Sequence, residues 1–161
     1  MNAEERRKFV ENHRTAIFGY NRKNDGPSMS VVYYVMDGED ILVSTMFERG
    51  KAKAVLANPK VSLCVLDEKW PLTYLQVYCI AAIESDIEAA AELLMRVAGL
   101  MAQEPMPDSV RPNLRKLAVE EKRVVIRLKP YQTFETPPRH VSKPEDTRNL
   151  THWLGSVLPW K

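Results

Sequence analysis

Short apolar runs separated by turn residues dominate the first half of the chain, a pattern typical of antiparallel strands. Strands are predicted over residues 15–20 (TAIFGY), 29–36 (MSVVYYVM) and 41–45 (ILVST). Asn24-Asp25-Gly26 separates the first two runs, and Asp37-Gly38-Glu39-Asp40 separates the second from the third. Because Asp-Gly between apolar runs favours a hairpin, we expect these strands to follow one another as a meander.

The run 29–36 differs from its neighbours because it is apolar on both faces. One face carries Val32, Tyr34 and Met36, and the other carries Val31, Tyr33 and Val35. A barrel wall needs only one covered face, so something else must cover the second face. We expect either the helices of residues 86–121 or a second copy of the chain to do so.

The hydrophobic period becomes helical in four other stretches. Helices are predicted over residues 2–12, 49–58, 87–101 and 110–121, with Asp86 as a candidate N-cap of the third. Further strands are predicted over residues 61–66, 73–83 and 124–128. The links between strands are too short for parallel crossovers. We therefore predict a mainly β, α+β fold, in which helices pack against an antiparallel barrel.

Composition narrows the class of protein. The 161 residues, of which 45% are hydrophobic, exclude a wholly disordered chain and suffice for one domain over residues 1–135. Residues 136–161 form a C-terminal extension that is polar and proline-bearing at first and aromatic at its end. The net charge of +2 is small for a nucleic-acid binder, which disfavours that partner.

Other features bear on localisation and redox state. No apolar run is as long as a membrane span, and the N-terminal sequence MNAEERRKFVENH is too charged for a secretory signal. We therefore expect a cytoplasmic protein with no membrane association. Cys64 and Cys79 lie in apolar runs without metal-type spacing, so two buried, reduced thiols are predicted.

The sequence contains no self-sufficient catalytic motif. It has no GxGxxG, no GxxxxGK[ST], no HExxH and no GxSxG. His13, His140 and His152 are scattered without ligand spacing, so no metal site is predicted. The catalytic residues are therefore left unassigned.

One basic cluster carries chemistry of its own. Ser44 and Thr45 end a predicted strand, and Arg49, Lys51 and Lys53 open the helix that follows. Cations near a helix N-terminus oppose the helix macrodipole, and a bound anion relieves that conflict. Backbone N–H groups, hydroxyls and a guanidinium are suited to bind phosphate. The alternative is a solvated basic face, and both interpretations remain open at this point.

A second group lies around the start of the strand 73–83. Trp70, Tyr74 and Gln76 combine aromatic rings with an amide and could line a flat, conjugated ligand. The alternative is structural, with Trp70-Pro71 closing a loop and Tyr74 packing in the core.

An ordered series of segments resembles the pyridoxamine-phosphate-oxidase-like superfamily and, more narrowly, its flavin/deazaflavin-dependent oxidoreductases. The segments are Asp25-Gly26-Pro27, Val31-Val32-Tyr33, residues 41–45, Arg49-Gly50-Lys51 and residues 58–63. The resemblance covers roughly residues 10–85. It implies an FMN-binding split β-barrel and a homodimer, with the cofactor in a groove between the two copies.

The resemblance also implies a site with three parts. The cofactor phosphate is expected at Arg49 and Lys51. Contacts with the ring are expected from the strand positions Val31, Val32, Tyr33, Ser44 and Thr45. Trp70, Tyr74 and Gln76 fall where the partner subunit often contributes. The extension 136–161 is longer than in minimal members of the superfamily, and it could cover the groove or wrap the partner subunit.

The implied activity is hydride transfer between the bound cofactor and a conjugated small molecule. The expected cofactor is the deazaflavin coenzyme F-420 or FMN, ahead of FAD or heme. Lys53 and Lys60 offer extra cations for the acidic tail of the deazaflavin, which favours it. Tyr33, Tyr34 or solvent could supply a proton. One alternative is a flavin or heme carrier without turnover, and His13, His140 or His152 near the groove would favour heme. Another is nucleic-acid binding through Lys51, Lys53 and Lys60.

Overall fold

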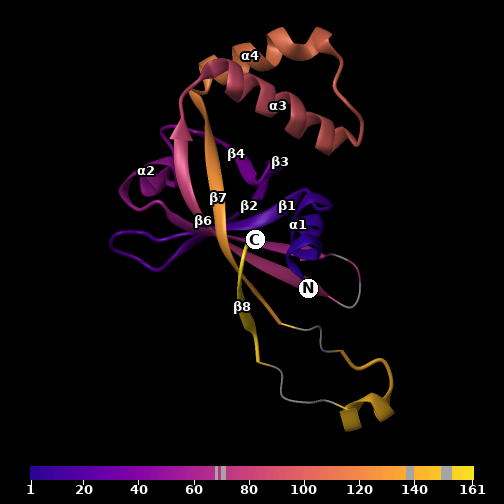
Figure 1. Cartoon of the computed structure of the whole chain (residues 1–161). Helices are drawn as coiled ribbons and strands as arrows, with labels where there is room; N and C mark the ends of the chain where they lie inside the picture. Colours follow the sequence, from indigo (N-terminus) through magenta and orange to yellow (C-terminus); the bar gives the residue numbers. More distant parts are fainter. Residues whose placement is uncertain (68, 70–71, 137–139, 150–153) are drawn as a thin grey trace.

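The computed structural model describes residues 1–67, 69, 72–136, 140–149 and 154–161. Its strands form one antiparallel sheet in the order β2-β1-β5-β6-β7-β4-β3, and β8 pairs with β7 (Figure 1). The strands are β1 (Thr15–Tyr20), β2 (Ser28–Tyr33), β3 (Val35–Asp37), β4 (Asp40–Met46), β5 (Lys60–Asp67), β6 (Thr73–Glu84), β7 (Arg123–Glu135) and β8 (Ser156–Pro159). The predicted α+β fold with an antiparallel split barrel is confirmed.

The sheet curls on itself because its two edge strands are consecutive in the chain. Only Tyr34 separates β2 from β3, and these strands occupy opposite ends of the strand order. The Tyr34 backbone N–H donates to the Arg14 carbonyl at 3.2 Å, and its buried hydroxyl donates to the Val10 carbonyl at 2.6 Å. The prediction of one strand over residues 29–36 is therefore wrong, because the chain crosses there from one edge of the sheet to the other.

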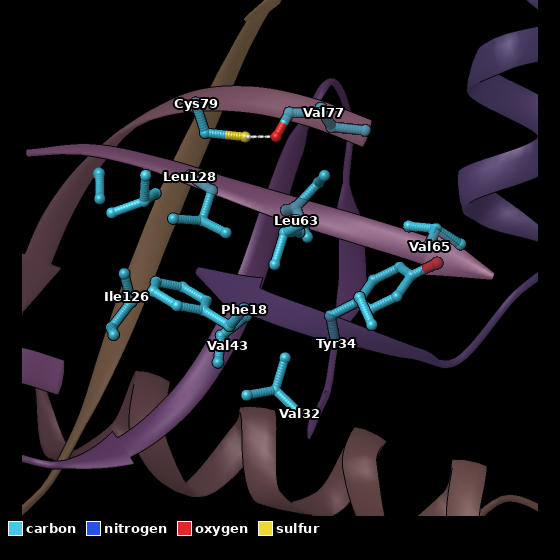
Figure 2. Close-up of a cluster of buried hydrophobic side chains, with 14 of the residues drawn as sticks. Phe18, Val32, Tyr34, Val43, Leu63, Val65, Val77, Cys79, Ile126 and Leu128 are labelled. Atoms are coloured by element: carbon cyan, nitrogen blue, oxygen red, sulfur yellow. Dashed lines mark hydrogen bonds between the residues drawn. The ribbon is translucent and has the colours of Figure 1, made fainter. Parts of the chain in front are cut away.

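The main core fills the inside of the barrel (Figure 2). On β5, Val61, Leu63 and Val65 are buried, whereas the residues between them are not, as the period of a strand requires. Side chains from β1, β4, β6 and β7 meet them from the other walls. Burial of each large aliphatic or aromatic side chain contributes about 1.5–3 kcal/mol, so the barrel interior is the main source of stability.

One face of β2 stays uncovered in a single copy of the chain. Val31 is 73% exposed and Met29 is 69% exposed, whereas Val32 is buried in the core. The helices α3 (Ile87–Ala102) and α4 (Arg111–Glu120) pack against β3, β4 and β7, and they cover only the part of this face at Tyr33 and Val35. The helices thus cover part of the second face, as one of the two expectations had it, and covering of the rest by a second copy stays a prediction.

The helices begin close to the predicted positions. Asn2 caps α1 (Ala3–Glu11), and its amide oxygen accepts from the Glu5 N–H in a capping box. Asp86 caps α3 as predicted and accepts from the first N–H groups of the helix. A second apolar cluster joins α3 to the barrel through Val35, Leu42, Leu93 and Val125. Within the described ranges, no helix is long and apolar enough to span a membrane.

The C-terminal residues return to the barrel. β8 pairs with the end of β7, and Trp160 is only 3% exposed within the main core. The Trp160 indole N–H donates to Glu39 Oε2 at 2.9 Å, and the buried Arg6 guanidinium donates to the Pro159 carbonyl at 2.6 Å. Between β7 and β8, the segment that holds the short helix Pro144–Asn149 projects away from the barrel (Figure 1). Packing of the extension over a groove or on a partner stays a prediction.

Candidate cofactor site at the start of α2

The candidate phosphate site lies where β4 leads into α2 (Gly50–Ala57). Arg49 is the N-cap residue in an extended conformation, and its side chain makes no capping hydrogen bond. The first turn of α2 contains no acidic residue. The first N–H groups of a helix have no partner within the helix, so this end offers donors and a partial positive charge to an anion.

Lys51 and Arg49 bring two cations together without a counter-ion. The Lys51 ammonium lies 4.9 Å from the centre of the Phe18 ring and is half-buried. Burial, with the nearby Arg49 charge, lowers the pKa of Lys51 to about 8. Across the described part of the chain, neither cation has an ion-pair partner, because Glu48 binds the Lys122 ammonium at 2.6 Å instead. An anion bound here would therefore stabilise the half-buried Lys51 ammonium and offset its repulsion with the Arg49 guanidinium.

The two hydroxyls at the end of β4 do not act together. Ser44 pairs with Val125 and Thr45 with Val124, and successive side chains of a strand point to opposite faces. Thr45 is buried, and the Ser44 hydroxyl is a buried oxygen with no hydrogen-bond partner among the described residues. Since Val125 belongs to the cluster under α3, Ser44 points toward that side. One phosphate can therefore bind the side chain of only one of them.

β2 provides the third part of the expected site. Its one paired neighbour is β1, so half of its backbone N–H and C=O groups face away from a partner strand. β2 also contacts β4 without pairing to it. Val32 points into the core, Val31 points to the outer face and Tyr33 packs beside the α3 cluster. The free edge of β2 therefore presents alternating hydrogen-bond donors and acceptors.

Tyr74 and Gln76 do not join this cluster within one copy of the chain. Gln76 pairs with Cys64, which pairs with Ile17, which in turn pairs with Val31. Three strand spacings separate Gln76 from Val31, which is about 14 Å. Tyr74 contacts Thr136 through the two hydroxyls at 3.3 Å. Trp70 lies outside the described residues.

Sequence reasoning missed Phe18 and Tyr20. The centres of the two rings lie 6.1 Å apart, and a Cβ on Gly50 would lie 3.6 Å from the Tyr20 hydroxyl. Tyr20 also lines a groove of about 380 Å³ together with Met29, Lys60 and Tyr78. Only the pairing of β1 with β5 brings the end of β1 beside α2, so no local pattern could have identified these residues.

The described histidines and cysteines do not gather into an alternative metal site. Within the ranges that the structure describes, no cluster of His, Cys, Asp and Glu could hold a metal ion. His152 lies outside those ranges. Cys79 is buried as predicted, but Cys64 is only half-buried, because it sits on the outer face of the sheet. Both thiols are free.

Known proteins are similar to this chain in sequence and in fold. The model of the family described as pyridoxamine 5'-phosphate oxidase matches residues 3–136. The fold is similar to the conserved hypothetical protein Rv2991 from Mycobacterium tuberculosis, with a TM-score of 0.72, 21% identity, and coverage of 90% of this chain and 94% of that one. No curated protein sequence matches this chain significantly.

Two other solved structures of similar fold have names that mention a cofactor. A protein described as an F420 reductase matches with a TM-score of 0.62 and 20% identity over 78% of this chain and 93% of that one. HutZ, a heme storage protein from Vibrio cholerae, matches with a TM-score of 0.57 and 17% identity over 79% and 88%. Identities this low show the shared fold only.

Proposed function

This chain belongs to the pyridoxamine 5'-phosphate oxidase family, and from that premise we propose that it is a flavin- or deazaflavin-dependent oxidoreductase. The observation that carries the proposal is the pair of cations at the start of α2. Arg49 and the half-buried Lys51 have no counter-ion in the described parts of the chain, and the helix end adds unpaired N–H groups. A phosphate group supplies the missing negative charge and accepts those donors.

The chain's own residues bind and orient the cofactor. When bound, the tricyclic ring supplies hydride chemistry. Arg49 and Lys51 would hold the phosphate. The free edge of β2, over Val31, Val32 and Tyr33, would hydrogen-bond the polar edge of the ring.

The deazaflavin coenzyme F-420 is our first choice of cofactor, and FMN is the second. Lys53 and Lys60 are both exposed. Lys60 lines the same groove as Tyr20, and the Tyr20 hydroxyl lies beside Gly50 at the start of α2. These cations suit the acidic tail that the deazaflavin carries beyond its phosphate and FMN lacks. FAD and heme rank after them.

The active form that we propose is a homodimer. One row of outward-facing residues crosses the sheet through Val31, Ile17, Cys64, Gln76, Phe134 and Val157. Val31 and Val157 are exposed at its ends, and the residues between them, all apolar except Gln76, are partly exposed, so a second copy would cover apolar side chains here. A second copy packed on this face would bring its Gln76 and Tyr74 toward the groove.

The rival function is a carrier without turnover, binding flavin or heme on the same fold. The likeness to a heme storage protein is what favours it. An absorption spectrum of the purified protein distinguishes the cofactors, because flavin, deazaflavin and heme absorb at different wavelengths. Turnover of an added electron acceptor by the loaded protein then separates an enzyme from a carrier.

Cofactor titration tests the phosphate site. Arg49→Ala and Lys51→Ala should each weaken binding of F-420 and FMN by roughly 10- to 150-fold, since charge-assisted hydrogen bonds contribute about 1.5–3 kcal/mol each. Lys53→Ala is the matched control, because Lys53 is an exposed cation on the same helix. It should leave FMN binding unchanged. Equal affinities for all three variants and the native protein would rule out this site.

A further inference from the structure

The connection between β4 and α2 is a tight turn that contains one acidic residue, Glu48. The Arg49 backbone N–H donates to the Met46 carbonyl at 3.1 Å, so Phe47 and Glu48 are the two central residues of a β-turn. Glu48 therefore directly precedes Arg49, the N-cap residue of α2. A carboxylate in this turn could serve as a counter-ion for the cations of the candidate phosphate site.

A second corner of the fold, between α4 and β7, holds this turn in place. The ladder between β4 and β7 ends at the pair Met46 and Arg123. One residue beyond that pair, the Phe47 backbone N–H donates to the Lys122 carbonyl at 2.9 Å. Lys122 has a φ of 49°, and its own N–H donates to the Val119 carbonyl at 3.1 Å. Backbone bonds thus fix the position of Lys122 beside the turn, whatever the charge of its side chain.

The Lys122 side chain binds the acidic residue of the turn. Its Nζ lies 2.6 Å from Glu48 Oε1. The hydrogen bond from Lys122, its charge and the charge of Lys53 lower the pKa of Glu48, so the carboxylate is ionised at neutral pH. Among the residues that the structure describes, Lys122 is the ion-pair partner of Glu48. Glu48 is therefore not available as a counter-ion for Arg49 and Lys51.

This ion pair lies in water and not in the core. The Lys122 side chain is 65% exposed and the Glu48 side chain is 69% exposed. Ion pairs that are this exposed contribute little to folding stability, so the fold does not depend on this one. The pair instead determines where the negative charge of Glu48 lies. Loss of the Lys122 charge would release the carboxylate, while the backbone bonds keep the turn in place.

A released Glu48 carboxylate would be drawn to the start of α2. The unpaired N–H groups and the partial positive charge of that helix end attract an anion, and Arg49 adds a full charge. These are the groups that we expect to bind the cofactor phosphate. Glu48 would then compete with the phosphate for the same donors, at a high effective concentration because it belongs to the same chain.

We propose that Lys122 is a positioning residue for the phosphate site and that it acts by holding Glu48 away from Arg49 and the start of α2. This inference rests on the function proposed above. Lys122 acts through Glu48 and not on the phosphate itself. A contact at the C-terminal end of α4 thereby sets how strongly the cofactor binds at the other side of the turn.

A double-mutant cycle on FMN and F-420 binding tests this role. Lys122→Gln should weaken binding of both by roughly threefold to tenfold, whereas Glu48→Gln should change it by less than about twofold, since the native carboxylate is already held away. The double variant should recover the native affinity, because no carboxylate is left to compete. Lys116→Gln is the matched control, because it removes another ion pair of an exposed lysine, with Glu120 on α4, and should have no effect.

The other outcomes of the cycle contradict the role. If Glu48→Gln strengthens binding as much as Lys122→Gln weakens it, the two charges act on the phosphate separately and at a distance. If the double variant binds as weakly as Lys122→Gln, Lys122 supports the turn and does not act through Glu48. Native affinity in Lys122→Gln would show that the released carboxylate does not compete.

The position of the carboxylate can also be measured without cofactor. The NMR shift of the Glu48 carboxyl carbon, followed against pH in the full chain, gives its pKa. In Lys122→Gln, adding Arg49→Gln should raise this pKa, because the carboxylate then loses its new partner, whereas Arg49→Gln alone should leave it nearly unchanged. An unaltered pKa on adding Arg49→Gln to Lys122→Gln would overturn the inference. Failure of the native protein to bind FMN or F-420 would contradict the proposed function and, with it, the role of Lys122 in binding, while the titration still decides where Glu48 lies.

Discussion

The Lys51 ammonium lies 4.9 Å from the centre of the Phe18 ring, so a cation from the first turn of α2 packs against an aromatic ring of the barrel core. Phe18 is fully buried, and its ring attracts the cation electrostatically. That attraction does not fully offset lost hydration, because the pKa of Lys51 falls to about 8. The site therefore carries an incompletely stabilised charge before any ligand is present.

The first prediction is that phosphate binding depends on pH through Lys51. Bound phosphate stabilises the ammonium and raises its pKa, so binding is strongest below the free pKa of about 8 and weakens above it. For one linked proton, FMN affinity should fall roughly tenfold from about pH 7 to about pH 9. Titration calorimetry would measure both the affinity and the proton uptake.

A charge-preserving variant gives the control for that experiment. Lys51→Arg keeps the cation at all accessible pH values, so its affinity should stay nearly constant over this range. If native protein and Lys51→Arg show the same pH dependence, Lys51 is not the group responsible.

The second prediction concerns the C-terminal anchor. Trp160 fills the base of the main core, and its indole N–H donates to Glu39. Trp160→Ala should lower the free energy of unfolding by about 3–5 kcal/mol, because it leaves a cavity and an unpaired carboxylate oxygen. Urea denaturation measures the change. Leu154→Ala, at an 83% exposed position, should change it by less than about 0.5 kcal/mol.

The sequence was informative wherever local pattern decides structure. The cap at Asp86, the turn at Asp37-Gly38 and the alternation along β5 are local signals, and the helices and strands follow them. The break at Tyr34 could not be read this way. Its side chain is apolar enough for a strand, and only the closing of the sheet decides that the chain leaves β1 there to pair with β4.

In the candidate site, too, the sequence identified the residues that a local pattern marks and missed those that only the fold brings together. The cluster of Arg49 and Lys51 was visible because cations at a helix N-terminus conflict with the helix dipole. Phe18 and Tyr20 were not assigned, since their place beside α2 depends on which segments meet in space. Ser44 and Thr45 were grouped by sequence, but strand geometry directs them to opposite faces.

The third prediction is that the outer face of the sheet forms the dimer. Val31→Glu places a charge within this apolar face, so it should convert the protein to monomers. Light scattering should then give a mass close to 18.5 kDa, against about twice that mass for the native protein. Val119→Glu, at a half-exposed position on α4, should leave the dimer intact. A native mass of one chain would contradict the dimer.

The last prediction uses Cys64 to locate that interface. Cys64 lies on the outer face between Ile17 and Gln76, and it is half-buried in a single copy. Burial already raises the pKa of its thiol, and a partner covering the face would exclude reagent as well. Labelling should therefore be slow in the native dimer and much faster in Val31→Glu, because only the thiolate reacts and it needs access. Cys79 is the internal control, because it is buried within the barrel and should stay unlabelled in both proteins until they unfold. Rapid labelling of Cys64 in a dimer would place the interface on another surface, whereas labelling of Cys79 without denaturant would show that Val31→Glu had opened the barrel.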